Sequence, residues 1–185
     1  MVLGLKCGTV TLVDHDPEWE AVAAQTIERL WHVFGSAAKD IQHIGSTSIN
    51  GIKAKPSIGI VMAVDRFELI EPLIPLMEQE GFIVGYRIRE NECHIVIVVY
   101  KDRSCSVETH SILVVKSNDS KYKDSLCFRN YLNANPNVAK IYETHKLEAA
   151  EKSNNDRSVY KAYKSDFMQQ ILEEALIWAS ASDTR

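Results

Sequence analysis

The stretch HIGSTSINGIKAKPSIGIV, residues 43–61, joins a turn rich in glycine and serine to a run of apolar residues. Glycine lets a ligand approach the main chain closely, and successive backbone N–H groups in such a turn can bind an anion. The apolar run, residues 57–64, is typical of a central strand that is covered on both faces. The stretch therefore predicts an anion-binding turn directly before a buried strand.

Carboxylates are missing from this part of the chain. No Asp or Glu occurs between Ile41 and Val64. Sites that hold a phosphate often also hold Mg²⁺, which prefers oxygen ligands and chiefly carboxylates. We therefore expect no metal site at this turn and no cofactor, while the sequence leaves a bound nucleotide or Mg²⁺ open.

The regions around the stretch show alternating helix and strand patterns. A helix is predicted from Asp16-Pro17-Glu18, which combines an N-cap acid with a proline at the first position, to Gly35. Hydrophobic periodicity predicts further helices over residues 66–80, 122–133, 138–152 and 159–179, and strands over residues 8–13, 41–44, 57–64, 82–88, 93–100 and 105–115. We therefore expect an α/β (α+β) fold: a mixed β-sheet flanked by helices, with a C-terminal helical segment, in a single domain over residues 1–185.

Composition and charge exclude several classes of function. The 185 residues carry a formal net charge of −4, which argues against a dedicated nucleic-acid binder. No apolar run reaches the ~20 residues of a membrane span. The four cysteines show no CxxC pairing, so a structural zinc site is not expected. We expect a cytoplasmic protein with a small-molecule ligand and without nucleic-acid or membrane partners; its oligomeric state stays open.

The turn itself carries candidate ligand-binding residues. Gly45, Ser46 and Thr47 offer backbone and hydroxyl donors to an anion. Lys55 follows closely and can neutralise a phosphate or a carboxylate. His43, directly before the turn, is a candidate acid–base group, and the alternative is a structural histidine with its hydrogen bonds satisfied inside the protein.

Two titratable residues of the predicted hairpin are further catalytic candidates. Glu108 and His110 stand two positions apart on a predicted strand, so their side chains should share one face. If that face meets His43, three titratable groups converge without a metal. The alternative is that Glu108 and His110 are surface residues of the hairpin.

Three segments of the chain resemble the GrpB family, a branch of the nucleotidyltransferase superfamily. The stretch HIGSTSINGIKAKPSIGI is similar to the family signature, and FRNYLNANPNVAKIYETHKLEAA, residues 128–150, is similar to its FRDYL segment and the helix that follows. YKAYK, residues 160–164, resembles the start of its terminal helix. The resemblance covers almost the whole chain and implies the nucleotidyltransferase fold, with its site at the Gly-Ser turn and the next strand.

The chain departs from that pattern where the superfamily holds its metal. The resemblance places an Asp at the position of Gly59 and a second carboxylate at that of Val61. Residues i and i+2 of a strand point to the same face, so two acids there can share Mg²⁺. Gly59 and Val61 lack such ligands, which puts metal-dependent transfer in doubt. Glu108, Glu92 or Asp102 of the hairpin are alternative sources of an acid.

The C-terminal half offers basic ligand contacts. Residues 116–164 contain ten Lys or Arg and six Asp or Glu, so this part is locally positive. The resemblance implies that Arg129, Lys146 and Lys164 cover the cleft and bind an anion. They can instead pair with Glu143 and Glu148 or face water.

Three functions are consistent with these observations. The first is a divergent enzyme that binds a phosphorylated or carboxylated small molecule and acts by metal-independent acid–base chemistry, such as condensation, cyclisation or isomerisation. The second is a catalytically inactive module that binds a nucleotide or metabolite. The third is a Mg²⁺-dependent nucleotidyltransferase that recruits its acids from elsewhere.

Overall fold

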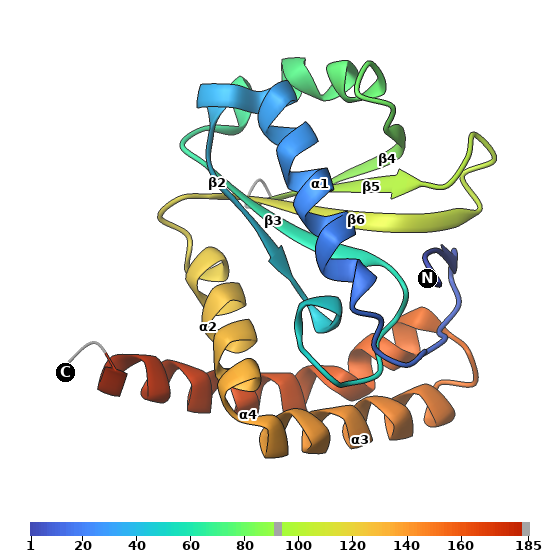
Figure 1. Cartoon of the computed structure of the whole chain (residues 1–185), viewed down its shortest axis with the longest axis vertical. Helices are drawn as coiled ribbons and strands as arrows, with labels where there is room; N and C mark the ends of the chain where they lie inside the picture. The colour runs from blue at the N-terminus through green and yellow to red at the C-terminus, as the bar shows by residue number, and fades with distance from the viewer. Residues whose placement is uncertain (91–93, 183–185) are drawn as a thin grey trace.

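The computed structural model describes residues 1–90 and 94–182, and a mixed β-sheet forms its centre (Figure 1). The strands follow the order β2-β3-β6-β5-β4, and β1 pairs with β6 off this path. Their bounds are β1 Leu5–Lys6, β2 Ala38–Ile44, β3 Ile58–Val64, β4 Ile83–Glu90, β5 His94–Tyr100 and β6 Val107–Lys116. The β3–β6 pair is parallel and the other described pairs are antiparallel. The mixed sheet that the sequence predicts is therefore confirmed.

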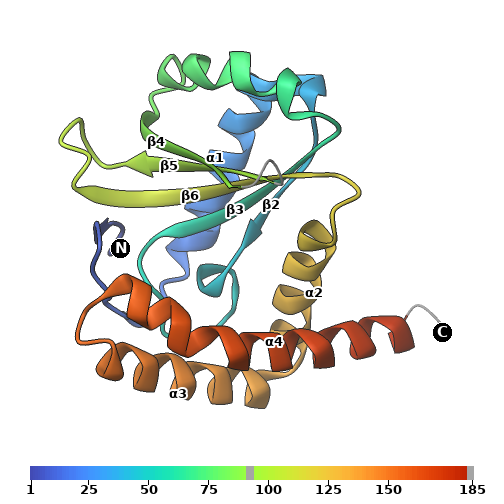
Figure 2. The same cartoon turned by 180° about the vertical axis from the view of Figure 1, so that it is seen from behind.

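Helices lie on both sides of this sheet (Figures 1 and 2). On one side are α1 (Glu18–Phe34) and the 3₁₀ segments η3 (Phe67–Leu69) and η4 (Glu71–Glu78). The C-terminal helices α2 (Ser120–Ala134), α3 (Pro136–Lys152) and α4 (Arg157–Ser182) pack against one another on the other side. No described helix has the length and apolarity needed to cross a membrane.

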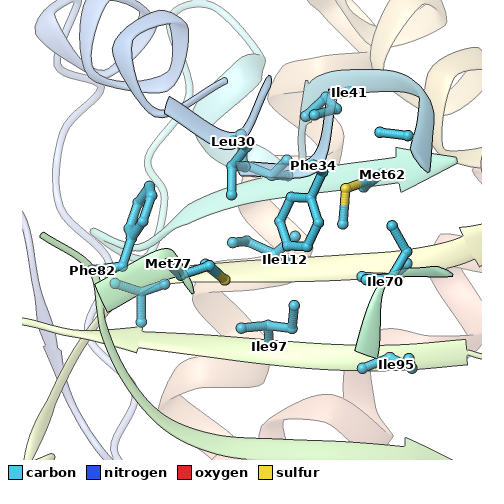
Figure 3. Close-up of a cluster of buried hydrophobic side chains, with 14 of the residues drawn as sticks. Leu30, Phe34, Ile41, Met62, Ile70, Met77, Phe82, Ile95, Ile97 and Ile112 are labelled. Atoms are coloured by element: carbon cyan, nitrogen blue, oxygen red, sulfur yellow. The ribbon is translucent and has the colours of Figure 1, made fainter. Parts of the chain in front are cut away.

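The main hydrophobic core lies between α1, η4 and the sheet (Figure 3). Leu30 and Phe34 reach it from α1, and Met77 reaches it from η4. Alternate residues of the strands, such as Ile97 of β5 and Ile112 of β6, point into it and are fully buried. This core fixes β3, and with it the turn between β2 and β3 that carries the candidate site.

Two predicted elements differ from the structure. The strand predicted over residues 8–13 is wrong: within it only Val13 forms a bridge, with Ala54, because Val10 packs against α3 and α4 instead. The helix predicted over residues 66–80 forms 3₁₀ segments, since Pro72 and Pro75 lack the N–H groups that an α-helix needs. The predicted start of β5, Cys93, and the candidate acid Glu92 lie outside the described residues.

Candidate functional site

The turn between β2 and β3 is built around Gly45. Its φ of 77° and ψ of −173° belong to a region that only glycine adopts readily. The chain then enters the short 3₁₀ segment η2 (Ser46–Ser48), and the Ser48 hydroxyl donates to the Gly45 carbonyl at 2.7 Å. The predicted Gly-Ser turn is therefore confirmed as a tight turn at the end of an edge strand.

Two separate cavities open on either side of this turn. One, of about 560 Å³, is lined by Gly45, Ser46 and Lys164, together with Lys161 and Tyr142, and is called the lysine cavity below. The other, of about 390 Å³, lies along the outer edge of β2 and is called the edge cavity; its lining includes Glu20, Ala24, Gln42, His43, Thr47 and Arg129. Six of the predicted site residues are thus divided between the two cavities, three in each, and the other four line neither: Lys55, Lys146, Glu108 and His110.

Two lysines lie near Tyr160 beside the lysine cavity: Lys164, which lines the cavity, and Lys55, which does not. The Nζ atoms of Lys55 and Lys164 lie 5.7 and 5.4 Å from the centre of the Tyr160 ring. Burial, followed by the charges of Arg157 and Lys164, lowers the pKa of Lys55 to about 7. An anion bound here would relieve the repulsion among these cations.

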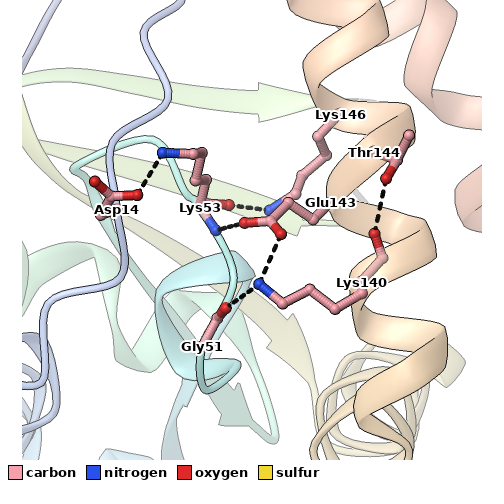
Figure 4. A network of polar contacts seen from close by, with 7 residues as sticks. All are labelled: Asp14, Gly51, Lys53, Lys140, Glu143, Thr144 and Lys146. Carbon is pink, nitrogen blue, oxygen red and sulfur yellow. Dashed lines mark hydrogen bonds and ion pairs between the residues drawn. The ribbon is translucent and has the colours of Figure 1, made fainter.

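The third predicted lysine, Lys146, has a different role. Its side chain is buried, and its ammonium donates to the Lys53 carbonyl while lying 4.8 Å from the centre of the Tyr142 ring (Figure 4). Burial, followed by the charge of Lys164, lowers the pKa of Lys146 to about 7. Lys146 lines neither cavity, so its observed contact supports the loop rather than a ligand.

Neighbouring residues of α3 hold the same loop (Figure 4). The Glu143 carboxylate accepts from the backbone N–H of Lys53 and from the Lys140 ammonium, the latter at 2.8 Å. Lys140 also donates to the Gly51 carbonyl at 2.6 Å. These contacts fasten residues 51–53 to α3 and thereby position Lys55, two residues further on.

His43 faces the edge cavity and is neutral at ordinary pH. Its Nε2 lies 2.9 Å from the Thr47 hydroxyl. Burial, followed by the charge of Arg129, lowers the pKa of His43 to about 4. A neutral imidazole can accept a proton, but a pKa of about 4 makes His43 a weaker base than an ordinary histidine.

Glu108 and His110 do not share a face, contrary to the prediction. Val99 pairs with His110 and Tyr100 with Glu108, so Thr109 is an extra residue in β6 and breaks the alternation. Glu108 forms a bidentate ion pair with Arg157 of α4, at 2.5 and 2.7 Å.

The His110 ring is likewise occupied. Its Nε2 lies 3.1 Å from the Thr26 hydroxyl of α1, and its Nδ1 lies 2.9 Å from the Thr109 hydroxyl. Both Glu108 and His110 are buried, and neither lines the lysine cavity or the edge cavity. The three predicted titratable groups therefore do not converge on one ligand.

The residues at β3 do not fit a magnesium ion. A Cβ atom on Gly59 would lie 2.7 Å from the Ile44 carbonyl oxygen, so the backbone of β2 occupies the space of a side chain. Across residues 1–90 and 94–182, no group of three or more His, Cys, Asp or Glu is placed to hold a metal. Asp102 accepts from Ser104 in the β5–β6 turn and supplies no acid here.

Three cationic residues in or beside the lysine cavity were not predicted from the sequence: Lys121 and Lys161, which line it, and Arg157, which lies near Lys55. Arg157, Lys161 and Lys164 are spaced i, i+4 and i+7 in the sequence, which places them on one face of α4. This spacing was the signal available from the sequence. It indicates a basic stripe, but the structure was needed to show that the stripe borders the Gly-Ser turn.

The fold is similar to that of solved nucleotidyltransferases. The chain is similar to terminal uridylyl transferase 4 from Trypanosoma brucei with bound dUTP, with a TM-score of 0.54 and 12% identity. The match covers 81% of this chain and 52% of that one. At this identity the likeness shows the fold alone, which is nucleotidyltransferase-like.

The particular family follows from closer matches. The family model described as GrpB protein matches residues 9–174, so the chain belongs to the GrpB family. Glutamate-rich protein GrpB of Alkalihalophilus pseudofirmus is 34% identical over 174 residues, which covers 94% of this chain and 99% of that protein. The crystal structure of conserved protein GrpB from Enterococcus faecalis has a TM-score of 0.75 and 24% identity, covering 91% of this chain and 99% of that one. The family resemblance is therefore confirmed.

Proposed function

We propose that this GrpB-family protein binds a phosphorylated small molecule in the lysine cavity and acts on it by metal-independent acid–base chemistry. Condensation, cyclisation and isomerisation are the reaction types in view. The observation that carries the proposal is the gathering of cations beside the Gly-Ser turn. A carboxylated ligand would use the same cations, but a phosphate carries more charge and more acceptor oxygens.

The charge balance around the lysine cavity supports an anionic ligand. Lys121, Lys161 and Lys164 line the cavity. Lys55 does not line it but lies close enough to Arg157, Lys161 and Lys164 to interact with their charges, and Arg157 is paired with Glu108. Among the described lining residues Asp124 is the one acid. The lysines that line the cavity outnumber its one acid, so the excess positive charge would stabilise an anion bound there.

The rest of the lining suits a ligand with an apolar body. Phe128 of α2 and Met168 and Leu172 of α4 line the cavity beside the lysines. A molecule with a phosphate at one end and a planar ring at the other would contact both parts. Nucleotides are therefore the first ligands to test, and the uridylyl transferase with bound dUTP shares the fold.

His43 is the proposed acid–base residue. It stands three residues before Ser46 at the end of β2 and is neutral at ordinary pH. Because His43 lines the edge cavity, a ligand in the lysine cavity must reach past the Gly-Ser turn to meet it. One positioned general base contributes ~10²–10⁴-fold to a rate. Glu108 and His110 are not part of the proposal, because their polar atoms are occupied by Arg157, Thr26 and Thr109.

A catalytically inactive binding module is the second candidate. His43 lines the edge cavity rather than the lysine cavity, and its Nε2 already contacts Thr47. That separation favours binding without turnover. A Mg²⁺-dependent transferase ranks below both, because Gly59 and Val61 supply no metal ligand.

A binding and turnover experiment tests the proposal. Nucleotides and phosphorylated metabolites are titrated into the protein in EDTA, and Lys164→Ala is compared with Lys123→Ala, an exposed lysine that lines neither cavity. We expect K164A to weaken binding ~10-fold or more, the size of one lost charge-assisted contact, and K123A to leave it unchanged. Hits are then incubated with wild-type protein and His43→Ala.

The outcomes separate the candidates. A product whose formation falls ~10²-fold or more in H43A supports the enzyme. Saturable binding without product supports the binding module. If no phosphorylated compound binds, or if K123A weakens binding as much as K164A, the lysine cavity is not the ligand site.

A further inference from the structure

The edge cavity is a second, separate candidate binding site. It lies between α1, the outer edge of β2, η2 and α2, and it shares no lining residue with the lysine cavity. Its volume of about 390 Å³ suits a small ligand. A ligand in the lysine cavity would therefore not explain the residues that line the edge cavity.

One wall of the edge cavity carries Arg129, which interacts with the charge of Asp40 but forms its described hydrogen bonds with neutral acceptors. Arg129 Nη1 donates to the His43 carbonyl at 2.8 Å and to Gln42 Oε1 at 3.2 Å, and Nε donates to Asn130 Oδ1 at 3.0 Å. All three acceptors are neutral, and no carboxylate of the described residues forms an ion pair with Arg129. A half-buried guanidinium in this state favours a ligand carboxylate.

The wall from α1 carries the opposite charge. Glu20 lines the same cavity, and its carboxylate forms no hydrogen bond or ion pair with another described residue. Ala23, Ala24 and Ile27 provide an apolar surface along the same helix. The cavity thus presents a cation, an anion and an apolar patch to one small volume.

We propose that the edge cavity binds a free α-amino acid. The carboxylate of the ligand would meet Arg129, its ammonium would meet Glu20, and its side chain would lie on the alanines of α1. A phosphate fits this cavity less well than the lysine cavity, because Glu20 would repel it. A neutral polar molecule would form neither of these charge-assisted contacts.

The chemistry of His43 agrees with this ligand. The imidazole also lines the edge cavity and is neutral at ordinary pH. Its contact with Thr47 uses Nε2, which leaves Nδ1 for a polar group of the ligand. The inference does not rest on the proposed function of the lysine cavity.

Matched variants of α1 test the inference. Ala24→Phe fills the edge cavity, and Ala21→Phe adds the same ring to an exposed residue of the same helix outside it. Glu20→Gln removes the anion, and Glu28→Gln is its control on the same helix. The standard amino acids are titrated by calorimetry into the full chain, and the thermal melting of each variant confirms that it is folded.

We expect one or more amino acids to bind, and A24F to abolish this binding while A21F retains it. E20Q should weaken binding ~10-fold, as expected for one lost charged contact, and E28Q should not. The deaminated acid and the carboxamide of the best ligand should each bind ~10-fold more weakly for the same reason. K164A should leave amino-acid binding intact, which separates this site from the lysine cavity.

Three results would overturn the inference. The first is that no amino acid binds. The second is that binding survives in folded A24F, which would place the ligand elsewhere. The third is that a ligand without a carboxylate or without an ammonium binds as tightly as the amino acid.

Discussion

Gly59 shows how a single position decides whether β3 can hold a metal. Where the family resemblance implies an Asp, this chain has glycine, and the Ile44 carbonyl of β2 has taken up the space of the side chain. The absence of the acid is therefore coupled to the close pairing of β2 and β3. A simple return of the carboxylate would require the backbone to move.

Gly59→Ala should destabilise the protein by ~1–3 kcal/mol, the usual cost of overpacking a well-packed site. The added Cβ would lie 2.7 Å from the Ile44 oxygen, and backbone cannot yield as a flexible side chain would. Urea unfolding measures the change. Ser111→Ala, at the partner position on β6, is the control and should change stability little. Equal stability of G59A and wild type would contradict the close packing.

At the scale of single residues, the sequence predicted which residues form the turn, but it did not predict the directions of the side chains on β6. Gly45 and Ser46 were placed correctly at a tight turn. The pairing of Glu108 with His110 failed, because a period of two assumes a regular strand and the extra Thr109 changes the face. A bulge depends on how the partner strand is paired, and that information is not local.

The loop that carries Lys55 is held in place by helix α3. Glu143 and Lys140, together with the buried Lys146, fasten residues 51–53 to α3 (Figure 4). The loop has little regular structure of its own, so these contacts decide where Lys55 lies. Ligand binding at the lysine cavity should therefore depend on α3 residues that do not touch the ligand.

Glu143→Ala should cost ~1–3 kcal/mol of stability, because the Lys53 N–H and the Lys140 ammonium lose their acceptor. It should also weaken binding of a phosphorylated ligand, since Lys55 is then less firmly placed. Urea unfolding and calorimetry measure the two effects. Glu148→Ala, an exposed residue of the same helix, is the control. If the backbone amides of residues 51–53 keep their hydrogen-exchange protection in E143A, the Glu143 contacts are not needed to hold the loop.

The helices and most strands were predictable because their apolar periodicity is local and strong. The helix that ends at Gly35 and the strands β3, β4 and β6 follow the predicted ranges closely, whereas β2 begins three residues before its predicted range of 41–44. The exceptions have local or packing causes. Pro72 and Pro75 turn a helical pattern into 3₁₀ segments, and residues 8–13 alternate like a strand but pack on the C-terminal helices.

For the whole molecule, the net charge hides a strongly uneven distribution. The chain carries a formal charge of −4, yet four cations meet around Tyr160 and the Glu108 carboxylate. The sequence indicated a basic C-terminal half and the correct family. It did not indicate that the Gly-Ser turn would divide the predicted residues between two cavities, because that division depends on how α2 and α4 pack against β2.

The pH dependence of anion binding follows from the lowered pKa of Lys55. In the free protein this pKa is about 7, and a bound anion favours the ammonium and raises it. Between the free and the bound pKa values, binding takes up a proton. The association constant should therefore fall as pH rises above neutral, by up to ~10-fold per pH unit for one such group.

The most direct test is calorimetric titration of the best phosphorylated ligand in EDTA, from slightly acidic to alkaline pH. The account predicts saturable binding without metal, an affinity that falls as pH rises above neutral, and a flatter profile in Lys55→Arg, whose guanidinium stays charged. Binding that requires Mg²⁺, or an affinity that rises with pH above neutral, would contradict a metal-free anion site built on these lysines.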